Sequence, residues 1–277
     1  MKSRILFIML LTLVGRLVTA QETMRYDKDR NYYLFGVGYH LTGIQNPGLN
    51  YVIDRYNETR QGQSGAARLT RNMDYLNNPG GFAFGMFLLD NKYLNGYFFD
   101  LNAAFLKSKA RAEGVDVNQN PASRDLEFRT GNYSLDFGFM FYQSPFIDLG
   151  VGMGTSVQWG KIKTRAGDAD FEDAQDIITA GFEFFPQINF FLTKTAPVSL
   201  SVRPYYYIDL IKTDFNDLNE FINPYTALND PTEDQKGRFS HLGAQVRLNL
   251  MIRGAKQEGA RNIEGKHKTK RGTQGFE

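Results

Sequence analysis

Residues Gly131 to Trp159 read GNYSLDFGFMFYQSPFIDLGVGMGTSVQW, and the alternation within this stretch decides the fold. Before the break at Ser144-Pro145, every second residue is large and apolar: Tyr133, Leu135, Phe137, Phe139 and Phe141. After the break the pattern resumes with Ile147, Leu149, Val151, Met153, Val157 and Trp159. Successive side chains of a strand point to opposite faces. The stretch therefore predicts a β-hairpin with one wholly apolar face.

The other face of this hairpin carries Gly, Asn, Ser and Asp. A soluble antiparallel sheet instead shows water a face rich in Lys, Glu and Thr. Small residues suit a cramped interior, which leaves the aromatic face to point outward, and an outward apolar face is stable only against hydrocarbon. Transmembrane β-barrels are built in this way, with apolar residues toward lipid, polar residues in the lumen and aromatic residues at the interfaces.

The start of the chain indicates the same compartment. Lys2 and Arg4 precede the apolar run Ile5–Val14, and small residues follow at Val18-Thr19-Ala20. This pattern predicts a secretory signal peptide over residues 1–20, because the run is too short for a membrane-anchor helix. Its three basic residues account for more than the whole formal charge, so +2 becomes −1 on cleavage and no nucleic-acid partner is expected. The chain has no cysteine, which excludes disulfides and cysteine-based metal sites.

The same alternation recurs along the chain and predicts eight strands, at about 32–44, 81–89, 92–107, 126–143, 147–159, 177–193, 198–211 and 239–253. Short connections alternate with long ones. With both termini in the periplasm, every long connection lies outside, as in bacterial outer-membrane barrels.

Turn lengths agree with the side-chain parities. The outward residues of the second and third strands have opposite parity, which requires an even turn such as Asp90-Asn91. The sixth and seventh strands share parity and require an odd turn. Pro186 and Pro204 fall inside these two strands and are expected to face one another across a bulge, because proline removes a ladder donor.

The long connections differ in composition. In the first, over about residues 45–80, helical spacing after Asn46-Pro47 predicts a short amphipathic helix with its apolar face formed by Leu49, Val52, Ile53 and Tyr56. A second helix is suggested by Leu69, Met73 and Leu76. The segments 108–124, 163–176 and 214–236 are polar or acidic and are expected to be loops.

These features divide the chain into four parts. Residues 21–30 are charged and aperiodic, which indicates a short periplasmic lead after the signal peptide, and the barrel occupies residues 31–253. Residues 254–277 are rich in Gly and Lys, a composition that predicts a disordered basic periplasmic tail.

With its signal peptide, eight alternating strands, Gly-rich inward faces and aromatic outward faces, the chain resembles the small outer-membrane β-barrels of the OmpA/OmpX-like superfamily over about residues 31–253. The resemblance is one of architecture. It implies an all-β fold, an eight-stranded antiparallel transmembrane up-and-down β-barrel with long extracellular loops containing short helices. It also implies a place in the outer membrane of a double-membraned bacterium, in contact with outer-membrane lipid and lipopolysaccharide.

Several charged residues have inward parity: His40, Asp100, Asp136, Asp148, Glu183, Arg203, Asp209 and Arg247. One interpretation is a gated or selective pore. The other is a structural plug, in which acids pair with the two arginines across a lumen too narrow for bulk water. We favour the plug, because the interior of an eight-stranded barrel is just wide enough for side chains to fill, and arginine suits fixed pairing with carboxylates.

Two histidines raise the possibility of lipid-modifying catalysis. His40 lies near Thr42, and His241 adjoins Ser240. A nucleophile needs a base within hydrogen-bond reach and a third group that orients the base. Parity turns both histidines into the lumen, away from lipid, so no enzyme and no cofactor are expected.

The segment Asp168–Asp173 is dense in carboxylates, yet it lacks the glycine and spacing of a calcium-binding EF-hand loop. We therefore expect no metal site there and interpret the segment as a solvated loop near anionic lipopolysaccharide.

Several apolar residues in the first and last loops must be shielded from water: Leu49, Val52, Ile53, Tyr56, Leu218, Phe221, Ile222 and Tyr225. Either the two loops pack on each other above the first and last strands, or these residues form an exposed docking patch for a partner. The sequence leaves both open.

These observations predict a non-enzymatic outer-membrane protein with a structural or partner-binding role, as an accessory subunit of a larger envelope assembly such as secretion or barrel-insertion machinery. Its contacts with other envelope proteins are expected through the extracellular loops or the periplasmic tail. Passive transport of small solutes through the lumen is the alternative, and lipid-modifying catalysis is the third.

Overall fold

The computed structural model describes residues 31–61, 68–90, 96–144, 146–192, 197–224, 226 and 230–254. The expected signal peptide, the periplasmic lead and nearly all of the basic tail lie outside the described residues. Eight strands form a closed ring: β1 (Tyr32–Ile44), β3 (Gly80–Asp90), β4 (Tyr97–Val115), β5 (Pro121–Gln143), β6 (Ile147–Ala166), β7 (Glu172–Phe191), β8 (Val198–Asp209) and β11 (His241–Arg253).

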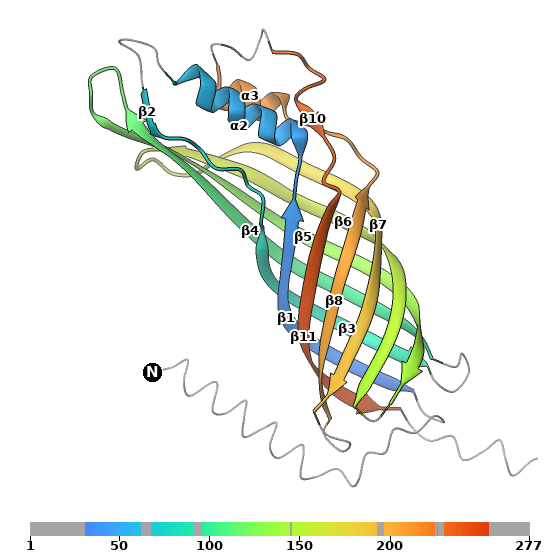
Figure 1. Ribbon diagram of the computed structural model, residues 1–277. Helices are drawn as coiled ribbons and strands as arrows, with labels where there is room; N and C mark the ends of the chain where they lie inside the picture. The colour runs from blue at the N-terminus through green and yellow to red at the C-terminus, as the bar shows by residue number, and fades with distance from the viewer. Residues whose placement is uncertain are drawn as a thin grey trace, which may run out of the picture.

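Each barrel strand pairs antiparallel with its neighbour in sequence, and the pairing of β1 with β11 closes the ring (Figure 1). The described chain therefore forms an eight-stranded up-and-down β-barrel, and this prediction is confirmed. Among the described residues, none of the helices combines the length and the apolar character needed to span a membrane.

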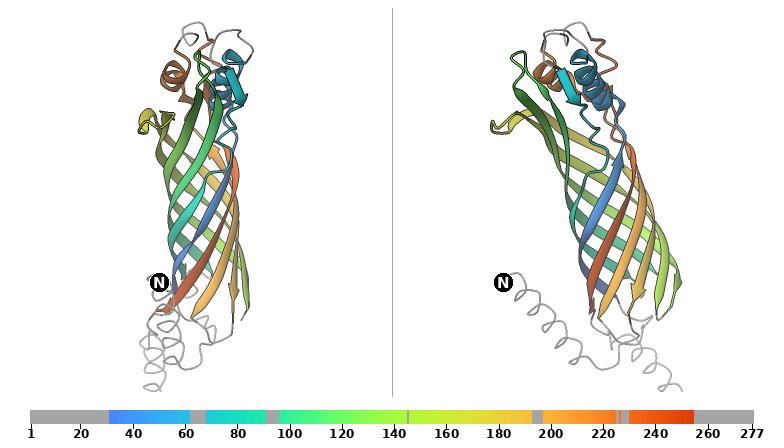
Figure 2. Two further views of the ribbon diagram at one scale, coloured as in Figure 1. Left: turned by 90° about the vertical axis from the view of Figure 1, so that its left-hand side faces the viewer. Right: turned by 60° about the vertical axis from the view of Figure 1, so that its left-hand side comes forward.

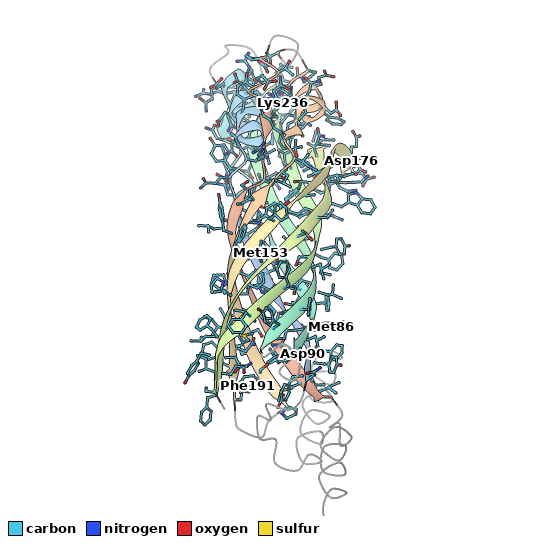
Figure 3. The ribbon with its side chains drawn as sticks, turned by 90° about the vertical axis from the view of Figure 1, so that its right-hand side faces the viewer. Met86, Asp90, Met153, Asp176, Phe191 and Lys236 are labelled. Carbon is cyan, nitrogen blue, oxygen red and sulfur yellow. The ribbon has the colours of Figure 1, made fainter. Side chains whose placement is uncertain are left out.

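The outside of the barrel is apolar over a broad belt. Large side chains of outward parity are exposed, among them Phe82 at 72%, Phe137 at 51% and Trp159 at 64%. On β5 the belt runs from Gly131, the register partner of Trp159, to Phe141. At about 3.4 Å per residue and a tilt near 45°, that stretch is roughly 24 Å tall, the height of the apolar band of outer-membrane barrels. Figure 3 shows side chains directed outward all along this wall, with Met153 near mid-height.

Side chains fill the lumen in layers. The half of the lumen near the chain ends contains more aromatic residues than the small inward-facing residues of the sequence predict. Near the chain ends an apolar cluster includes Tyr32, Phe87, Phe98, Met140 and Phe185. Glycines on the neighbouring strands make room for these rings: a Cβ on Gly152 would lie 2.5 Å from the ring of Phe185, its register partner. The inward glycines thus match inward aromatic residues of the adjacent strand.

The two longest connections fold into a compact structure over one end of the barrel, which we call the cap (Figures 1 and 2). It contains α2 (Pro47–Thr59), α3 (Asn216–Ile222) and the short pair β9 (Thr213–Asp214) and β10 (Lys236–Gly237). Both described chain ends lie at the opposite end of the barrel, which is the periplasmic end in this class of fold.

Two barrel hairpins, β4–β5 and β6–β7, extend past the barrel rim on one side of the cap. The outer ends of β4, β5, β6 and β7 stay paired there, and β2 (Arg68–Arg71) adds to the edge of β4. We call this projecting sheet, residues 68–71, 108–128 and 161–177, the wing (Figure 2).

The predicted loops at 108–124 and 163–176 are wrong, because most of these residues belong to strands with turns at 116–120 and 167–171. The alternation continues through both segments: Lys109 and Arg111 point outward, while Ala110 and Ala112 are buried. Above the belt an outward side chain meets water, so charged residues replace aromatic ones without ending the strand.

A second helix at Leu69–Leu76 is also wrong. Leu69 lies in β2, and Met73 and Leu76 lie in extended chain that packs into the cap. The side chain of Asn57 accepts a hydrogen bond from the Met73 N–H (2.8 Å) and donates one to the Met73 carbonyl (3.1 Å). These bonds satisfy the backbone that a helix would otherwise pair. The predicted helix at Leu49–Tyr56 is confirmed as α2.

The turns have the predicted odd or even number of residues, but their lengths differ from the prediction. Asp90 pairs with Tyr97, so the connection is even but longer than the expected Asp90-Asn91 turn. Pro186 and Pro204 lie opposite each other, as expected, but the register is the same on both sides of them and there is no bulge. The ladder is interrupted over residues 185–187 and 203–205 instead. Placing both prolines at one rung confines the loss of donors to that rung.

The first turn of α2 is stabilised by the side chain of its N-terminal flanking residue. The Asn46 side chain accepts a hydrogen bond from the Leu49 N–H (3.1 Å). We expect Asn46→Ala to cost about 1 kcal/mol of cap stability, because it leaves a helix N–H without its acceptor. Limited proteolysis of folded protein checks this: cleavage within residues 45–79 should accelerate about fivefold while the barrel stays intact, and an unchanged rate would contradict it.

Candidate functional site

An ion-pair network crosses the middle of the lumen. Arg203 on β8 contacts Asp100 on β4 and Asp136 on β5, the latter at 2.5 Å. Arg247 on β11 holds both oxygens of Asp100, at 3.0 and 2.5 Å. Glu183 on β7 lies 3.9 Å from Arg203. The five side chains are buried. In such surroundings the pairs hold only because several donors and acceptors converge.

Neutral groups complete the network. Arg203 donates from Nε to Gln187 (2.9 Å) and lies 3.9 Å above the ring of Phe185. Asn102 donates to Asp136 (2.8 Å) and accepts from Arg247 (2.5 Å). Sequence reasoning did not assign Gln187 or Phe185 to this site, although their parity on β7 matches that of Glu183. Parity shows which residues face the lumen but not which of them meet.

Three of the eight residues expected in the network lie outside it: Asp148, Asp209 and His40. Asp148 is buried near the periplasmic end, where its register partners are Gln143 and Asn189. Asp209 lies at the other end of the barrel, where it accepts from the N–H groups of Phe239 (2.7 Å) and Ile211 (3.0 Å). Asp209 therefore fixes the chain where β8 ends, and the prediction of one network of eight residues is wrong for these three.

His40 joins a separate hydrogen-bonded chain with Tyr205 and His241. The Tyr205 hydroxyl lies 2.5 Å from His40 Nε2 and 3.1 Å from His241 Nε2. His241 Nδ1 donates to the Phe239 carbonyl (2.5 Å), which makes its Nε2 an acceptor. The Tyr205 hydroxyl then donates to His241 and accepts from His40.

The two hydroxyls that lie near the histidines in the sequence are bonded elsewhere. The Ser240 hydroxyl accepts from the Asp209 N–H (3.0 Å), and the Thr42 hydroxyl donates to the Pro79 carbonyl (3.1 Å). Neither of these hydroxyls is bonded to a histidine, so Ser240 and Thr42 do not form the base–nucleophile pair that covalent catalysis needs.

The centre of the lumen is nearly solid. A cavity of about 10 Å³ lies between the ion-pair network and the histidine chain, lined by His40, Asn102, Glu183, Arg203 and Tyr205 among others. That volume is at the lower limit for a single water molecule. The side chains present therefore favour a plug over an aqueous pore.

The loop residues considered for partner docking are largely buried. Leu49, Val52, Ile53, Tyr56, Leu218 and Ile222 belong to the hydrophobic core of the cap. That core includes residues of the wing and the barrel mouth, such as Ala112, Phe128 and Ile162. Of the two alternatives for these residues, the structure therefore has the packed one, in which they close the barrel mouth, and not the exposed patch. Phe221 is 40% exposed, and Tyr225 lies outside the described residues.

The acidic segment Asp168–Asp173 lies at the β6–β7 turn. Its Asp173 pairs with Lys161 (2.5 Å) and Lys163 (2.8 Å). The hydrogen bonds from these two lysines lower the pKa of Asp173 to about 2. Over the described part of the chain there is no group of three or more His, Cys, Asp or Glu side chains arranged to hold a metal ion.

A closed ring of eight antiparallel strands, an exposed aromatic belt and a filled polar lumen together define a class of protein. The chain is a small transmembrane β-barrel of the bacterial outer-membrane type.

Comparisons with known proteins give similar folds and no family. No protein-family model and no curated protein matches the chain. The attachment invasion locus protein Ail of Yersinia pestis, solved with the heparin analogue sucrose octasulfate, is similar with a TM-score of 0.39 and 11% identity, over 80% of this chain and 99% of that one. OprG of Pseudomonas aeruginosa gives 0.38 and 11%, over 83% and 99%. Neisserial surface protein A gives 0.34 and 10%, over 80% and 96%. The assignment of the fold rests on the strand pairing and the belt.

Proposed function

We propose that this protein is a non-enzymatic, non-conducting outer-membrane barrel that serves as a partner-binding component of a larger cell-envelope assembly. The observation that carries the proposal is the cap. Both long connections are folded on a core of their own that continues into the barrel mouth. Ordering that much chain costs conformational entropy, which a protein needing only a membrane anchor would avoid with short turns.

The wing is the surface best suited to a partner. It extends beyond the barrel rim, away from lipid, and its β4–β5 turn carries Val117, which is 62% exposed. β2 pairs with β4 on one side, and on its other side the Leu69 N–H donates to the Arg60 carbonyl (3.2 Å). No described strand pairs with that side, and a strand edge without a partner strand is a template for pairing with a second chain. Accessory membership in secretion or barrel-insertion machinery is consistent with this geometry.

Passive transport is the second candidate and has less support. Solutes would have to cross the buried Arg203–Asp100 pair and the cavity of about 10 Å³ above it. We expect purified barrel in planar bilayers to give no steady conductance above background. A stable open channel would overturn the non-conducting part of the proposal.

Blocking the tip of the wing tests the partner. A short epitope inserted between Asn118 and Gln119 lies in an exposed turn and should leave the barrel folded. The same epitope between Ala169 and Asp170, in the neighbouring β6–β7 turn, is the matched control. After mild-detergent extraction from the native host, the unmodified and control proteins should co-purify with a stoichiometric partner, and the tip insertion should remove it. A wild-type barrel that purifies without a stoichiometric partner would overturn the proposal.

A further inference from the structure

The outer wall carries a row of cations directly above the aromatic belt. Lys107, Arg129 and Lys161 are register partners on β4, β5 and β6, and we call them the cation row. All three have outward parity and are 42–53% exposed. Adjacent strands lie about 4.8 Å apart, so the row spans roughly 10 Å.

The row below fixes the height of these cations in the membrane. It consists of Phe105, Gly131 and Trp159, again as register partners. Trp159 is the single tryptophan of the chain and is exposed at the upper limit of the belt. Tryptophan concentrates where hydrocarbon meets headgroups. Figure 3 places Asp176, the register partner of Lys161, well above Met153 and below the cap. The cation row therefore lies at the level of the outer-leaflet headgroups.

The cations exceed the acids available to them. Lys107, Lys109 and Arg129 all contact the single carboxylate of Glu127, the two lysines at 2.9 Å. Burial opposes ionisation of Glu127, but hydrogen bonds from the three cations outweigh it and hold its pKa at about 2. Three positive charges thus share one negative charge, which leaves an excess of two, while Lys161, the third member of the row, is paired with Asp173 (2.5 Å) and Asp176 (3.4 Å).

A groove opens beside these charges. It has a volume of about 540 Å³ and is lined by Phe105, Lys107, Arg129, Tyr133, Trp159 and Lys161 among others. Gly131 has no side chain, and the Tyr133 ring lies over it, so that a Cβ on Gly131 would be 3.0 Å from that ring. A second, mainly apolar groove of about 740 Å³ continues toward the membrane midplane and shares Tyr133, with Ala103 as the small residue in its floor.

We propose that this wall binds one phosphorylated glycolipid of the outer leaflet, with its phosphate on the cation row and an acyl chain in the two grooves. The cations complement an anionic headgroup and the grooves below complement hydrocarbon, so the site fits a lipid rather than a soluble anion. Lysine and arginine at a membrane surface favour anionic headgroups, and charge-assisted bonds to phosphate are the strong kind.

Native mass spectrometry of the full-length folded barrel, released from nanodiscs, tests the proposal. Three nanodisc preparations contain phosphorylated lipid A, dephosphorylated lipid A or phosphatidylglycerol in a neutral phospholipid. Wild-type protein should retain one phosphorylated lipid A, at least about tenfold more often than either other lipid. Equal retention of the dephosphorylated form would overturn the role of the phosphate. Equal retention of phosphatidylglycerol would overturn the assignment to a glycolipid.

Two sets of variants locate the site. Lys107→Gln, Arg129→Gln and Lys161→Gln together should reduce retention to the level of the dephosphorylated lipid. A matched triple above the cation row, with Arg71→Gln on the wing and Lys212→Gln and Lys236→Gln at the cap, removes the same charge elsewhere and should leave retention unchanged. Heat-modifiable gel mobility shows that each variant is folded. Gly131→Leu, which displaces the Tyr133 ring that lines the groove and keeps all cations, should weaken retention several-fold and shift Trp159 emission. Equal loss in both triples would mean that only net charge matters, which overturns the site.

Discussion

Replacing Arg203 with alanine is expected to destabilise the barrel by about 3–5 kcal/mol, the cost of breaking a buried ion pair by removing one partner. Arg203 contacts Asp100 and Asp136 and lies 3.9 Å from Glu183, and all four side chains are buried in the lumen. Without Arg203, Asp136 has no cation, and Arg247 alone remains on Asp100. Equilibrium unfolding of the purified barrel in urea, in lipid vesicles, measures the loss.

A double variant separates lost pairing from lost packing. Arg203→Met with Asp136→Asn removes one charge of each sign, keeps bulk against Phe185 and leaves the Arg247–Asp100 pair in place. Replacing a buried pair by groups of similar volume is often neutral, so the double variant should recover most of the stability that Arg203→Ala loses. If both variants were equally unstable, packing of the arginine stem rather than its charge would hold the lumen together.

Parity placed Arg203 and Asp100 in the lumen, but their contact was not predictable from the sequence. The two residues are 103 positions apart, and their meeting depends on the stagger of every strand between them. Turn parity gives only whether each connection is odd or even. The β3–β4 connection shows the limit: an even turn was expected at Asp90-Asn91, and the even connection found is longer. A turn that is longer by an even number of residues shifts a strand along its neighbour, but the same residues still face the lumen.

The wing and the cap were harder to predict for a related reason. The alternation of a strand is easiest to recognise where its outward residues are aromatic. Lys109 and Arg111 on β4 therefore indicate a polar loop, although they continue the two-residue spacing of the strand. In the cap, the spacing of Leu49, Val52, Ile53 and Tyr56 gave a helix, whereas the similar spacing from Leu69 to Leu76 did not. The difference is a tertiary contact, the pair of hydrogen bonds between the Asn57 side chain and the Met73 backbone. The spacing of apolar residues within one segment gives no information about a contact with another segment.

The orientation of the belt is tested by the second large expected effect. Phe137→Arg should cost about 2–4 kcal/mol, the range for arginine near the midplane on the lipid face of a barrel. Phe137 is 51% exposed and lies between Phe99 and Met153 in register, midway down the belt. Reversible folding into vesicles of fixed chain length gives the free energy, and Phe141→Arg at the periplasmic limit of the belt is the matched control, with an expected cost of about 0–1 kcal/mol.

The difference between these two positions matters more than either value. A soluble barrel with the same outward side chains would show a small effect at both sites, since an exposed arginine in water costs little. A soluble sheet that buried its aromatic face in a protein core would show a large effect at both sites, because each substitution would place a charge in that core. Only a hydrocarbon layer centred near Phe137 makes the cost fall toward Phe141, and that same layer places Trp159 and the cation row at its outer boundary.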